Sequence, residues 1–258
     1  MDAVITAGGL TQPGDLLYEV LPGGHKAFLD IAGKAMIQWV LDALSAAKTI
    51  ERVVIVGLKP DCGVTCSKPL TFVPDQNDLV ANLRAGVHKV LELNPSAEYV
   101  LAATSDVPAI TGEMVDWVVN TAMETEHDLY YNVISREVME KRFPGSRRSY
   151  LRLKDIDACG GDINVLRASV VSGRDEVWKR LVASRKNALK QAALIGYDTL
   201  FLVMFRLITM EGAVNMVSKR LGLRGRAVVC PYAEVGMDVD KPFQLEIMRA
   251  DLSRSKPG

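Results

Sequence analysis

Strand-length runs of apolar, β-branched residues alternate with helix-length segments over the first 135 residues, and this alternation restricts the fold more than any other feature. Strands that are apolar on both faces and separated by helices are typical of a parallel sheet covered by helices on both sides. The segments are strands at 4–6, 52–57, 71–75, 99–106 and 128–135 and helices at 37–47, 79–93 and 111–126. We therefore expect an α/β protein, a Rossmann-like three-layer α/β/α sandwich with a mostly parallel sheet.

The second half of the chain departs from this alternation. An arginine-rich segment at 136–155, which contains Pro144 and Gly145, predicts an inserted hairpin or loop. The later elements expected are a strand at 163–171, a helical stretch at about 176–221 broken near Gly196 and Gly212, strands at 226–232 and 234–239, and a helix at 242–254. We expect one domain over residues 1–258, with an inserted region at about 136–222, because no repeat divides the chain.

The charge and hydropathy of the chain disfavour two kinds of partner. Basic and acidic residues number 31 each, so no net charge draws the protein to nucleic acid or to an anionic membrane. The most apolar stretch, Leu194 to Met210, is interrupted by Asp198 and Arg206 and is shorter than the roughly 20 apolar residues of a transmembrane helix. The first residues lack the pattern of a signal peptide. We expect a cytoplasmic protein with no nucleic-acid partner and no membrane span.

The first strand runs directly into a glycine loop formed by Ala7, Gly8 and Gly9. Ligands of parallel sheets bind beyond the carboxyl ends of the strands, and glycine lets a base or phosphate approach the backbone N–H groups closely. The loop matches neither GxGxxG nor GxxxxGK[ST], which disfavours an ordinary dehydrogenase or kinase. Lys26 closes the longer loop that starts here, so it is either a phosphate-neutralising lysine or a solvated surface residue.

Carboxylates follow two other apolar segments. Asp106 ends the strand YVLAAT, where it is expected either to point into the ligand crevice or to cap a turn. Asp238 and Asp240 lie two apart on a segment expected to be extended, so their side chains would share one face. Because Mg²⁺ prefers one or two carboxylates together with phosphate oxygens, Asp106 with one of the later aspartates is a candidate metal site. The alternative for the later pair is a polar strand edge beside the last helix.

Four motifs, taken in order, resemble the molybdenum-cofactor-type (MobA-like) nucleotidyltransferase family. They are VITAGG at the start, GHKA followed by DIAGKAMIQWVLDAL, then TSDVPAIT, and finally GMDVDKPFQLE. The resemblance runs through the whole chain and implies a glycosyltransferase-A-like fold of the nucleotide-diphospho-sugar transferase type. It also implies transfer of an NMP from an NTP to a small phosphorylated acceptor, with Mg²⁺ as cofactor and pyrophosphate as product.

The same resemblance assigns roles to particular residues. It makes the glycine loop the nucleotide-contacting segment and Lys26 the phosphate-binding lysine. It makes Asp106 the chief metal ligand and Asp238 its partner, with Asp240 as the alternative. The mechanism implied is in-line attack of an acceptor phosphate oxygen on the α-phosphorus, with Mg²⁺ and Lys26 stabilising the developing charge.

Two further segments are expected to contact substrates. Amide side chains that could bond to base edges are Gln76, Asn77 and Asn82. The segment CGGDIN at 159–164 resembles the acceptor region of the family, so Asp162 or Asn164 is expected to contact the acceptor.

The sequence departs from the family pattern in two places. The arginine usual after AGG is absent and an enlarged loop takes its place, so Arg84, His25 or an arginine within 136–152 is expected to replace it. The long helical region at 176–222 is expected either to cover the acceptor side or to form a contact between copies of the chain. The remaining basic cluster, which either binds an anionic acceptor or forms a solvated loop, is Arg142, Arg147, Arg148, Arg152 and Lys154.

Two other functions remain open from the sequence. One is a glycosyltransferase that consumes a nucleotide sugar on the same fold, because fold alone does not fix function. Lys26 favours pyrophosphate chemistry, and the central motif SDVP has one aspartate where many glycosyltransferases have DxD. The other is a nucleotide-binding regulator that has lost catalysis, which the missing arginine would suggest and the retained Lys26, Asp106 and Asp238 oppose.

Overall fold

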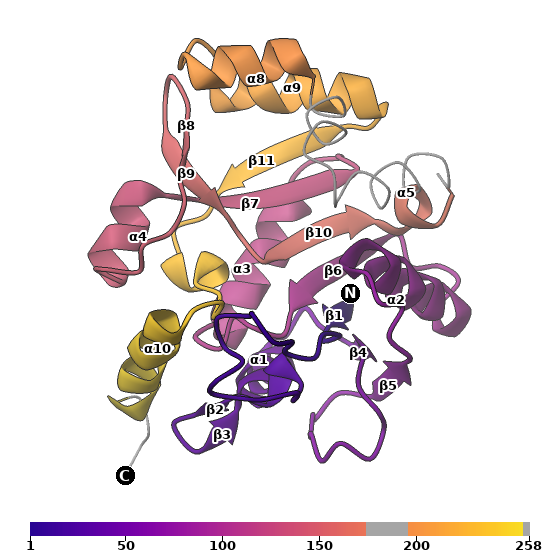
Figure 1. The fold of residues 1–258 in the computed structure, drawn as a ribbon. Coiled ribbons are helices and arrows are strands. Elements are labelled where there is room, and N and C mark those ends of the chain that lie inside the picture. Colours follow the sequence, from indigo (N-terminus) through magenta and orange to yellow (C-terminus); the bar gives the residue numbers. More distant parts are fainter. Residues whose placement is uncertain (174–195, 255–258) are drawn as a thin grey trace.

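The computed structural model describes residues 1–173 and 196–254, and in it helices surround a nine-stranded sheet (Figure 1). The strands of this sheet are β1 (Asp2–Thr6), β4 (Arg52–Val56), β5 (Leu70–Val73), β6 (Tyr99–Thr104), β7 (Leu129–Ser135), β8 (Leu151–Arg152), β9 (Asp157–Gly160), β10 (Ile163–Arg167) and β11 (Gly225–Val229). Their order is β5-β4-β1-β6-β10-β7-β9-β8, and β11 pairs with β7. A separate two-stranded ribbon joins β2 (Asp30–Ile31) to β3 (Lys34–Ala35).

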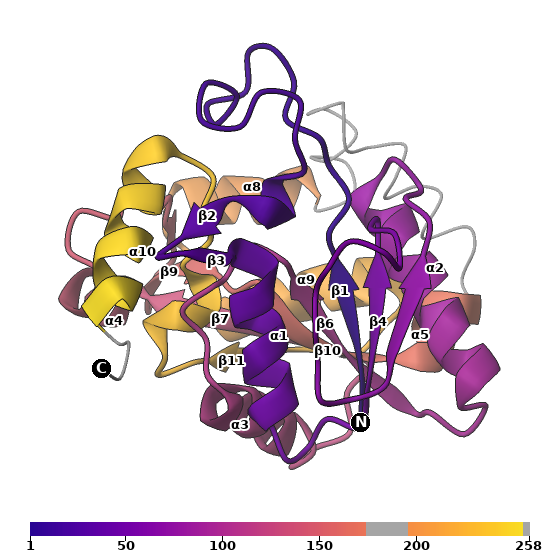
Figure 2. The ribbon, with the colours of Figure 1, turned by 90° about the horizontal axis from the view of Figure 1, so that it is seen from below.

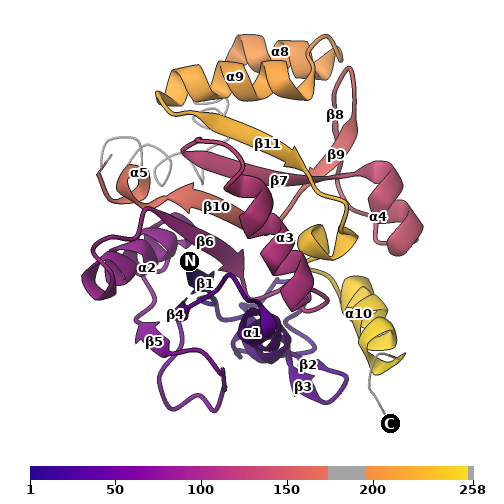
Figure 3. The ribbon, with the colours of Figure 1, turned by 180° about the vertical axis from the view of Figure 1, so that it is seen from behind.

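Alternate residues of β1 enter different cores, which is why the protein has three layers. Ala3 and Ile5 pack in the larger core, and Val4 packs in the smaller core on the opposite face. Helices α1 (Met36–Ala46) and α3 (Gly112–Ala122) pack in the larger core, to which the later helices α4 (Arg136–Arg142) and α10 (Pro242–Arg254) also contribute, and α2 (Leu79–Leu93) and α5 (Ala168–Gly173) pack in the smaller one. Figure 3 shows α1 and α3 together in front of the sheet. The α/β/α fold expected from the sequence is confirmed.

The sheet is parallel in one half and mixed overall. Strands β5, β4, β1 and β6 are all parallel, as the alternation of strands and helices predicted. Strand β10 then inserts antiparallel between β6 and β7, and β7 pairs antiparallel with β9. As a result, the last residues of β6 and the first residues of β10 lie side by side, at the end of the sheet where the parallel strands finish.

Helix boundaries follow the capping residues of the sequence. Asp78 accepts hydrogen bonds from the N–H groups of Val80 and Ala81 at the start of α2, and Thr111 caps α3 as predicted. Three expectations for the later elements are wrong. The segment 234–239 forms no strand, because a 3₁₀ turn, η2 (Ala233–Gly236), occupies its first part. The strand expected to reach residue 171 ends at Arg167, where α5 follows. The helix break predicted near Gly212 falls instead at 205–209, so Gly212 lies inside a helix.

The segment predicted as an insertion supplies part of the central sheet. It contributes α4 (Arg136–Arg142), β8, β9 and β10, and then α8 (Tyr197–Met204) and α9 (Met210–Leu221). Helices α8 and α9 lie together beyond β11 at one edge of the sheet (Figure 1). The part of the expected helical stretch at 174–195 lies outside the described residues. The last helix, α10 (Pro242–Arg254), lies beside the β2–β3 ribbon (Figure 2). Within the described ranges, no helix has the length and apolarity needed to cross a bilayer.

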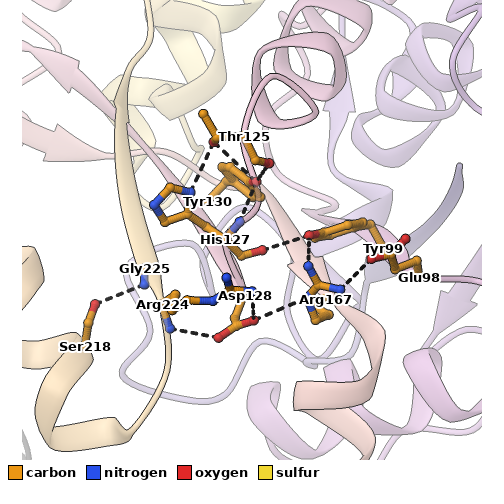
Figure 4. A network of polar contacts seen from close by, with 10 residues as sticks. All are labelled: Glu98, Tyr99, Thr125, His127, Asp128, Tyr130, Arg167, Ser218, Arg224 and Gly225. Carbon is orange, nitrogen blue, oxygen red and sulfur yellow. Dashed lines mark hydrogen bonds and ion pairs between the residues drawn. The ribbon is translucent and has the colours of Figure 1, made fainter.

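A polar network joins β6, β7, β10 and β11 at the end of the sheet that lies opposite the glycine loop (Figure 4). The carboxylate of Asp128, before β7, accepts a 2.8 Å hydrogen bond from the backbone N–H of Arg224 and forms a 3.2 Å ion pair with Arg167. Arg167 in turn contacts Glu98 and the hydroxyl of Tyr99 at the start of β6. Burial alone would raise the pKa of Asp128, but the hydrogen bonds and charges of Arg224 and the charge of Arg167 lower it below its ordinary value.

This network predicts a pH-dependent loss of stability in Asp128→Asn. The substitution should lower the free energy of unfolding by about 2 kcal/mol at pH 7, because it removes a buried charge-assisted acceptor. Since the folded pKa is depressed, the carboxylate stabilises the fold above its unfolded pKa of about 3.9, and this contribution is lost as pH falls through the folded pKa. Urea unfolding of both proteins should therefore show a difference that shrinks below about pH 4.

Glu98→Gln is the matched control for this prediction. The Glu98 side chain contacts the same arginine but is 67% exposed, so its loss should cost less than about 0.5 kcal/mol. An equal effect of the two substitutions, or a D128N effect that does not depend on pH, would contradict the assignment.

Candidate functional site

Backbone hydrogen bonds gather three acidic segments at the carboxyl ends of β1 and β6. The N–H of Ser105 donates to the carbonyl of Thr6, and the N–H of Thr104 donates to the carbonyl of Asp162 at the start of β10. The N–H of Val239 donates to the carbonyl of Asp106 at 3.0 Å. Because of these contacts, the residues after β6, before β10 and before α10 meet at one place.

Lys26 reaches this place from the end of the long loop that follows β1. The loop is closed by a bridge between Leu10 and His25, and the N–H of Lys26 donates to the carbonyl of Gly9 at 3.3 Å. The loop projects away from the sheet (Figure 2). The Lys26 ammonium donates to Asp106 Oδ2 at 2.6 Å and also to Asp240. The predicted lysine and the strand-end aspartate are therefore in direct contact.

The charge state of Lys26 follows from these partners. Its side chain is 25% exposed, and burial alone would lower its pKa. The charges of Asp106 and Asp240, with the hydrogen bonds to both, outweigh burial and raise the pKa above its ordinary value. The lysine is therefore fully protonated at neutral pH. Asp106 is held in turn by the Thr104 hydroxyl, which donates to its Oδ1 at 2.5 Å.

A second ion pair lies beside the first. Arg148 contacts Asp238 directly, and its guanidinium is 4.0 Å from Asp162. Burial raises the pKa of Asp162 to about 7, and the nearby charge of Asp106 adds to this increase while Arg148 opposes it. The carboxylates of Asp106, Asp162, Asp238 and Asp240 thus lie around Lys26 and Arg148.

Two cavities of about 340 Å³ each open beside these ion pairs, and Asp240 borders both. One is formed by the long loop together with Lys26, and includes Thr11, Asp15 and Leu17. The other is strongly charged, and its lining includes Arg147, Arg148, Asp162, Asp238 and Lys241. The two cavities are therefore adjacent: Lys26 lines the first, Asp162 and Asp238 line the second, and Asp240 lines both.

The glycine loop packs against a buried amide on α2. Asn82 accepts a 2.6 Å hydrogen bond from the N–H of Gln76 and donates to Asp75 at 2.8 Å. A Cβ on Gly8 would lie 2.4 Å from Asp75 Oδ1, and Gly9 has a φ of +125° that favours glycine. Asn82 thus shapes the wall of the loop. The prediction that Asn82 contacts the nucleotide stays a prediction.

The basic cluster singled out from the sequence divides into two parts. Arg142 pairs with Glu234 at 2.7 Å and with Asp251 at 2.8 Å, so it joins α4 to α10 and the η2 turn. Arg147 and Arg148 line the charged cavity, and the guanidinium of Arg147 lies 5.2 Å from the ring centre of Phe243. Neither His25 nor Arg84 lines either of these two cavities. Arg148 is the arginine from the expected segment that lies among the carboxylates.

The two late aspartates have different partners, a point that sequence spacing did not reveal. Asp240 contacts Lys26, whereas Asp238, which the resemblance makes the metal partner of Asp106, contacts Arg148. Asp162 lines the charged cavity, while the Asn164 amide accepts from the N–H of Asn132 at 2.8 Å and so links β10 to β7. The segment CGGDIN before β10 was the sequence signal for Asp162, but its closeness to Asp106 depends on the antiparallel insertion of β10.

The aspartate carboxylates of the site suit a divalent cation that is also coordinated by a bound ligand. Within residues 1–173 and 196–254, no three His, Cys, Asp or Glu side chains are placed together to hold a metal. Mg²⁺ commonly takes one or two carboxylates and completes its coordination with phosphate oxygens and water. Asp162 Oδ2 is buried without a hydrogen bond in the described chain, so this carboxylate has an oxygen atom left to bind a cation, whereas Asp238 Oδ1 contacts Arg148.

Comparison with known proteins gives a consistent result. The sequence profile of the MobA-like NTP transferase domain matches residues 3–197. A hypothetical transferase from Thermus thermophilus is 34% identical, with a TM-score of 0.81 over 95% of this chain and 98% of that one. A search among curated proteins found no match.

More distant solved structures share the fold. CMP:2-keto-3-deoxy-manno-octonic acid synthetase, solved in complex with CTP, has a TM-score of 0.59 at 15% identity and covers 99% of both chains. The 2-C-methyl-D-erythritol 4-phosphate cytidylyltransferase of Thermus thermophilus has a TM-score of 0.54 at 15% identity, over 98% of this chain and 100% of that one. At this identity the likeness establishes the fold.

Proposed function

The chain belongs to the MobA-like NTP transferase family and is therefore a nucleotidyltransferase, and from this premise we propose that it moves an NMP from an NTP to a small phosphorylated acceptor. The observation that carries the proposal is the contact of Lys26 with Asp106 and Asp240 at the carboxyl ends of β1 and β6. This is the edge where open α/β sheets bind nucleotides. Lys26 and Asp240 border two adjacent cavities that could each take one substrate.

In the proposed reaction an acceptor phosphate oxygen forms a bond to the α-phosphorus of the NTP. The bond from the α-phosphorus to the bridging oxygen breaks, and pyrophosphate leaves with that electron pair. Lys26, protonated at neutral pH, stabilises the negative charge that moves to the leaving group. The reaction needs no covalent enzyme intermediate, because the acceptor itself is the nucleophile.

The residues that would hold a metal lie beside those that would bind the acceptor, because Asp238 and Asp240 line the same cavity as Arg148 and Lys241. A Mg²⁺ ion would be held by Asp106 together with Asp238 or Asp240, and when bound it would neutralise charge on the nucleotide phosphates. Arg148 and Lys241 line the charged cavity and would bind the anionic group of the acceptor. The glycine loop, beside the Asp75–Asn82 pair, would take the nucleoside.

CTP is the first nucleotide to test. The names of two distant structural neighbours identify CTP as a bound ligand or a cytidylyl group as the one transferred. Their likeness to this chain is one of fold, so the choice of base is a proposal that binding must decide. The acceptor is defined by chemistry alone, as a small molecule bearing a phosphate.

The test is a thermal-shift titration with CTP, ATP, GTP and UTP, each with and without Mg²⁺. A single NTP that raises the melting temperature only with Mg²⁺ would support the proposal, because selective binding to the folded state stabilises it. That NTP is then assayed for pyrophosphate release with a panel of sugar and polyol phosphates. Stabilisation by nucleotide sugars and by no NTP would instead favour a glycosyltransferase, and NTP binding without turnover would favour a regulator.

Gly8→Ala should weaken NTP binding by about tenfold or more, with little change in folding. Its new methyl group would collide with Asp75 and Asn82, which must shift and deform the loop wall. Isothermal titration with the stabilising NTP measures the effect. Gly173→Ala is the matched control, because a Cβ there meets no atom of the described residues within 4 Å. An unchanged affinity in G8A would contradict the placement of the nucleoside.

A further inference from the structure

The ion pair between Arg148 and Asp238 leaves a polar atom of Arg148, and one of the neighbouring Asp162, unsatisfied. The Arg148 side chain is 15% exposed and that of Asp238 is 12% exposed, so both charges are largely removed from water. Asp238 Oδ1 contacts the Arg148 guanidinium, whereas Arg148 Nε and Asp162 Oδ2 are buried and form no hydrogen bond within the described chain. Buried charges normally have these positions filled. One donor and one acceptor therefore await partners beside the ion pair.

No single ion satisfies this arrangement. An anion bound to Arg148 alone would add negative charge beside Asp106, Asp162, Asp238 and Asp240. A cation bound to Asp238 and Asp162 alone would be repelled by Arg148, which already contacts Asp238. A cation on the carboxylates together with an anion on the guanidinium would give Asp162 Oδ2 and Arg148 Nε their partners, replace the contact between Arg148 and Asp238, and leave the net charge of the site unchanged.

We propose that Arg148 exchanges partners during binding: it neutralises Asp238 in the free protein and turns to the anionic group of the acceptor when a divalent cation binds the carboxylates. The inference rests on the proposed function, since it uses the metal and phosphorylated acceptor assigned there. It adds a regulation of that site, in which metal binding releases the residue that binds the acceptor.

The position of Arg148 allows this exchange. Its side chain and those of Asp162 and Asp238 line the same charged cavity, so the new partner lies in the space that Arg148 already borders. The adjacent backbone is held by the fully buried Ser146, whose N–H donates to the carbonyl of Phe143 at 3.1 Å. Arg147 cannot replace Arg148, because its guanidinium lies over the ring of Phe243. The guanidinium also has enough donors to contact a carboxylate and then a phosphate with the same geometry.

The exchange makes cation and anion binding cooperative. Each ligand removes the competitor of the other, so each raises the affinity for the other by the same factor. Because Arg148 competes with the cation for Asp238, its removal should tighten divalent cation binding in the absence of an anion. An effect on the order of tenfold is expected for a close charge pair at the edge of solvent.

The experiment measures Mn²⁺ binding to the full-length protein by the EPR signal of free Mn²⁺, without nucleotide. Inorganic phosphate serves as the anion, at a concentration that leaves the signal of protein-free buffer unchanged. In the wild type, phosphate should raise the Mn²⁺ affinity about tenfold. Arg148→Gln should bind Mn²⁺ about tenfold more tightly than the wild type without phosphate and should gain nothing from phosphate. Arg147→Gln is the matched control and should keep the wild-type values in the absence of phosphate.

Two other variants keep the test decisive. Arg148→Lys retains the charge without the planar guanidinium, so its Mn²⁺ affinity alone should stay near the wild type while the phosphate effect falls. This variant decides the question if R148Q does not fold. Asp238→Asn should weaken Mn²⁺ binding, because it removes the carboxylate for which Arg148 competes.

Three outcomes would overturn the inference. They are an R148Q protein that binds Mn²⁺ no more tightly than the wild type, an R147Q protein that binds it as tightly as R148Q, and a wild type that binds no Mn²⁺ with or without phosphate. None of these depends on turnover. The nucleotide titration with and without Mg²⁺ decides the proposed function separately, so failure of one can be told from failure of the other.

Discussion

Lys26→Met should lower kcat/KM for pyrophosphate release about 1000-fold, because the lysine is the cation that we propose stabilises charge on the leaving group. The protonated side chain contacts Asp106 and Asp240, which fixes its ammonium at the carboxyl end of the sheet. Methionine keeps the length and apolar stem of lysine and removes its charge. The assay uses the NTP and acceptor found by the titration and the panel.

Stability must be measured with activity in this variant. Removal of Lys26 leaves two carboxylates without their shared cation, which should cost no more than about 2 kcal/mol, because both acids retain contact with solvent. Lys34→Met is the matched control: Lys34 also pairs with an aspartate, Asp42, at 2.5 Å, but on the β3–α1 segment. It should retain full activity. A K26M protein with more than about a tenth of wild-type activity would contradict the assigned role.

Asp106→Asn should lower activity by a similar factor, on the order of 100- to 1000-fold, without loss of stability. The carboxylate is the proposed metal ligand, and an amide oxygen is a weaker ligand for Mg²⁺. At the same time the substitution removes one negative charge beside Asp162 and Asp240, so like-charge repulsion in the folded state decreases. The melting temperature should stay the same or rise, as is common when a functional group carries strain.

The opposite pattern is expected for Asp116→Asn, the matched control. Asp116 on α3 accepts hydrogen bonds from the backbone N–H of Thr49 at 2.8 Å and of Lys48 at 3.1 Å, away from both cavities. Its substitution should cost about 1–2 kcal/mol of stability and leave activity unchanged. Thermal melts and pyrophosphate release on both variants separate the two roles. A marked loss of stability in D106N with normal activity would show that Asp106 is a structural residue.

The parallel half of the sheet could be predicted from the sequence because each of its strands and helices is marked by a pattern within its own segment. Each of β1, β4, β5 and β6 is a short apolar run followed by a loop or helix signal, and Asp78 and Thr111 mark helix starts. The placement of Lys26 near Asp106 was implied by family resemblance and is present in the structure. These features depend on neighbouring residues or on the succession of motifs along the chain.

The remainder of the site depends on contacts between distant segments. The insertion of β10 between β6 and β7 brings Asp162 to Asp106, and no local pattern specifies which strands become neighbours. The period-two spacing of Asp238 and Asp240 suggested that their side chains share one face of a strand. The segment forms no strand after the 3₁₀ turn, and Asp238 contacts Arg148 while Asp240 contacts Lys26. Arg148 was one of several arginines in the sequence, and only packing separates it from Arg142.

The long loop between β1 and Lys26 starts and ends at the same place, where Leu10 pairs with His25. A loop with adjacent ends can change in length and composition at little cost to the rest of a protein. A graft of residues 12–22 from another chain should leave Lys26 in place, with its N–H bonded to Gly9, provided that Leu17 is kept, because this residue packs in the larger core. Because this loop also forms one of the two cavities, such a graft would remodel one proposed substrate cavity while leaving the contact of Lys26 with Asp106 unchanged. The loop is a natural unit for the divergence of substrate range, and for its redesign.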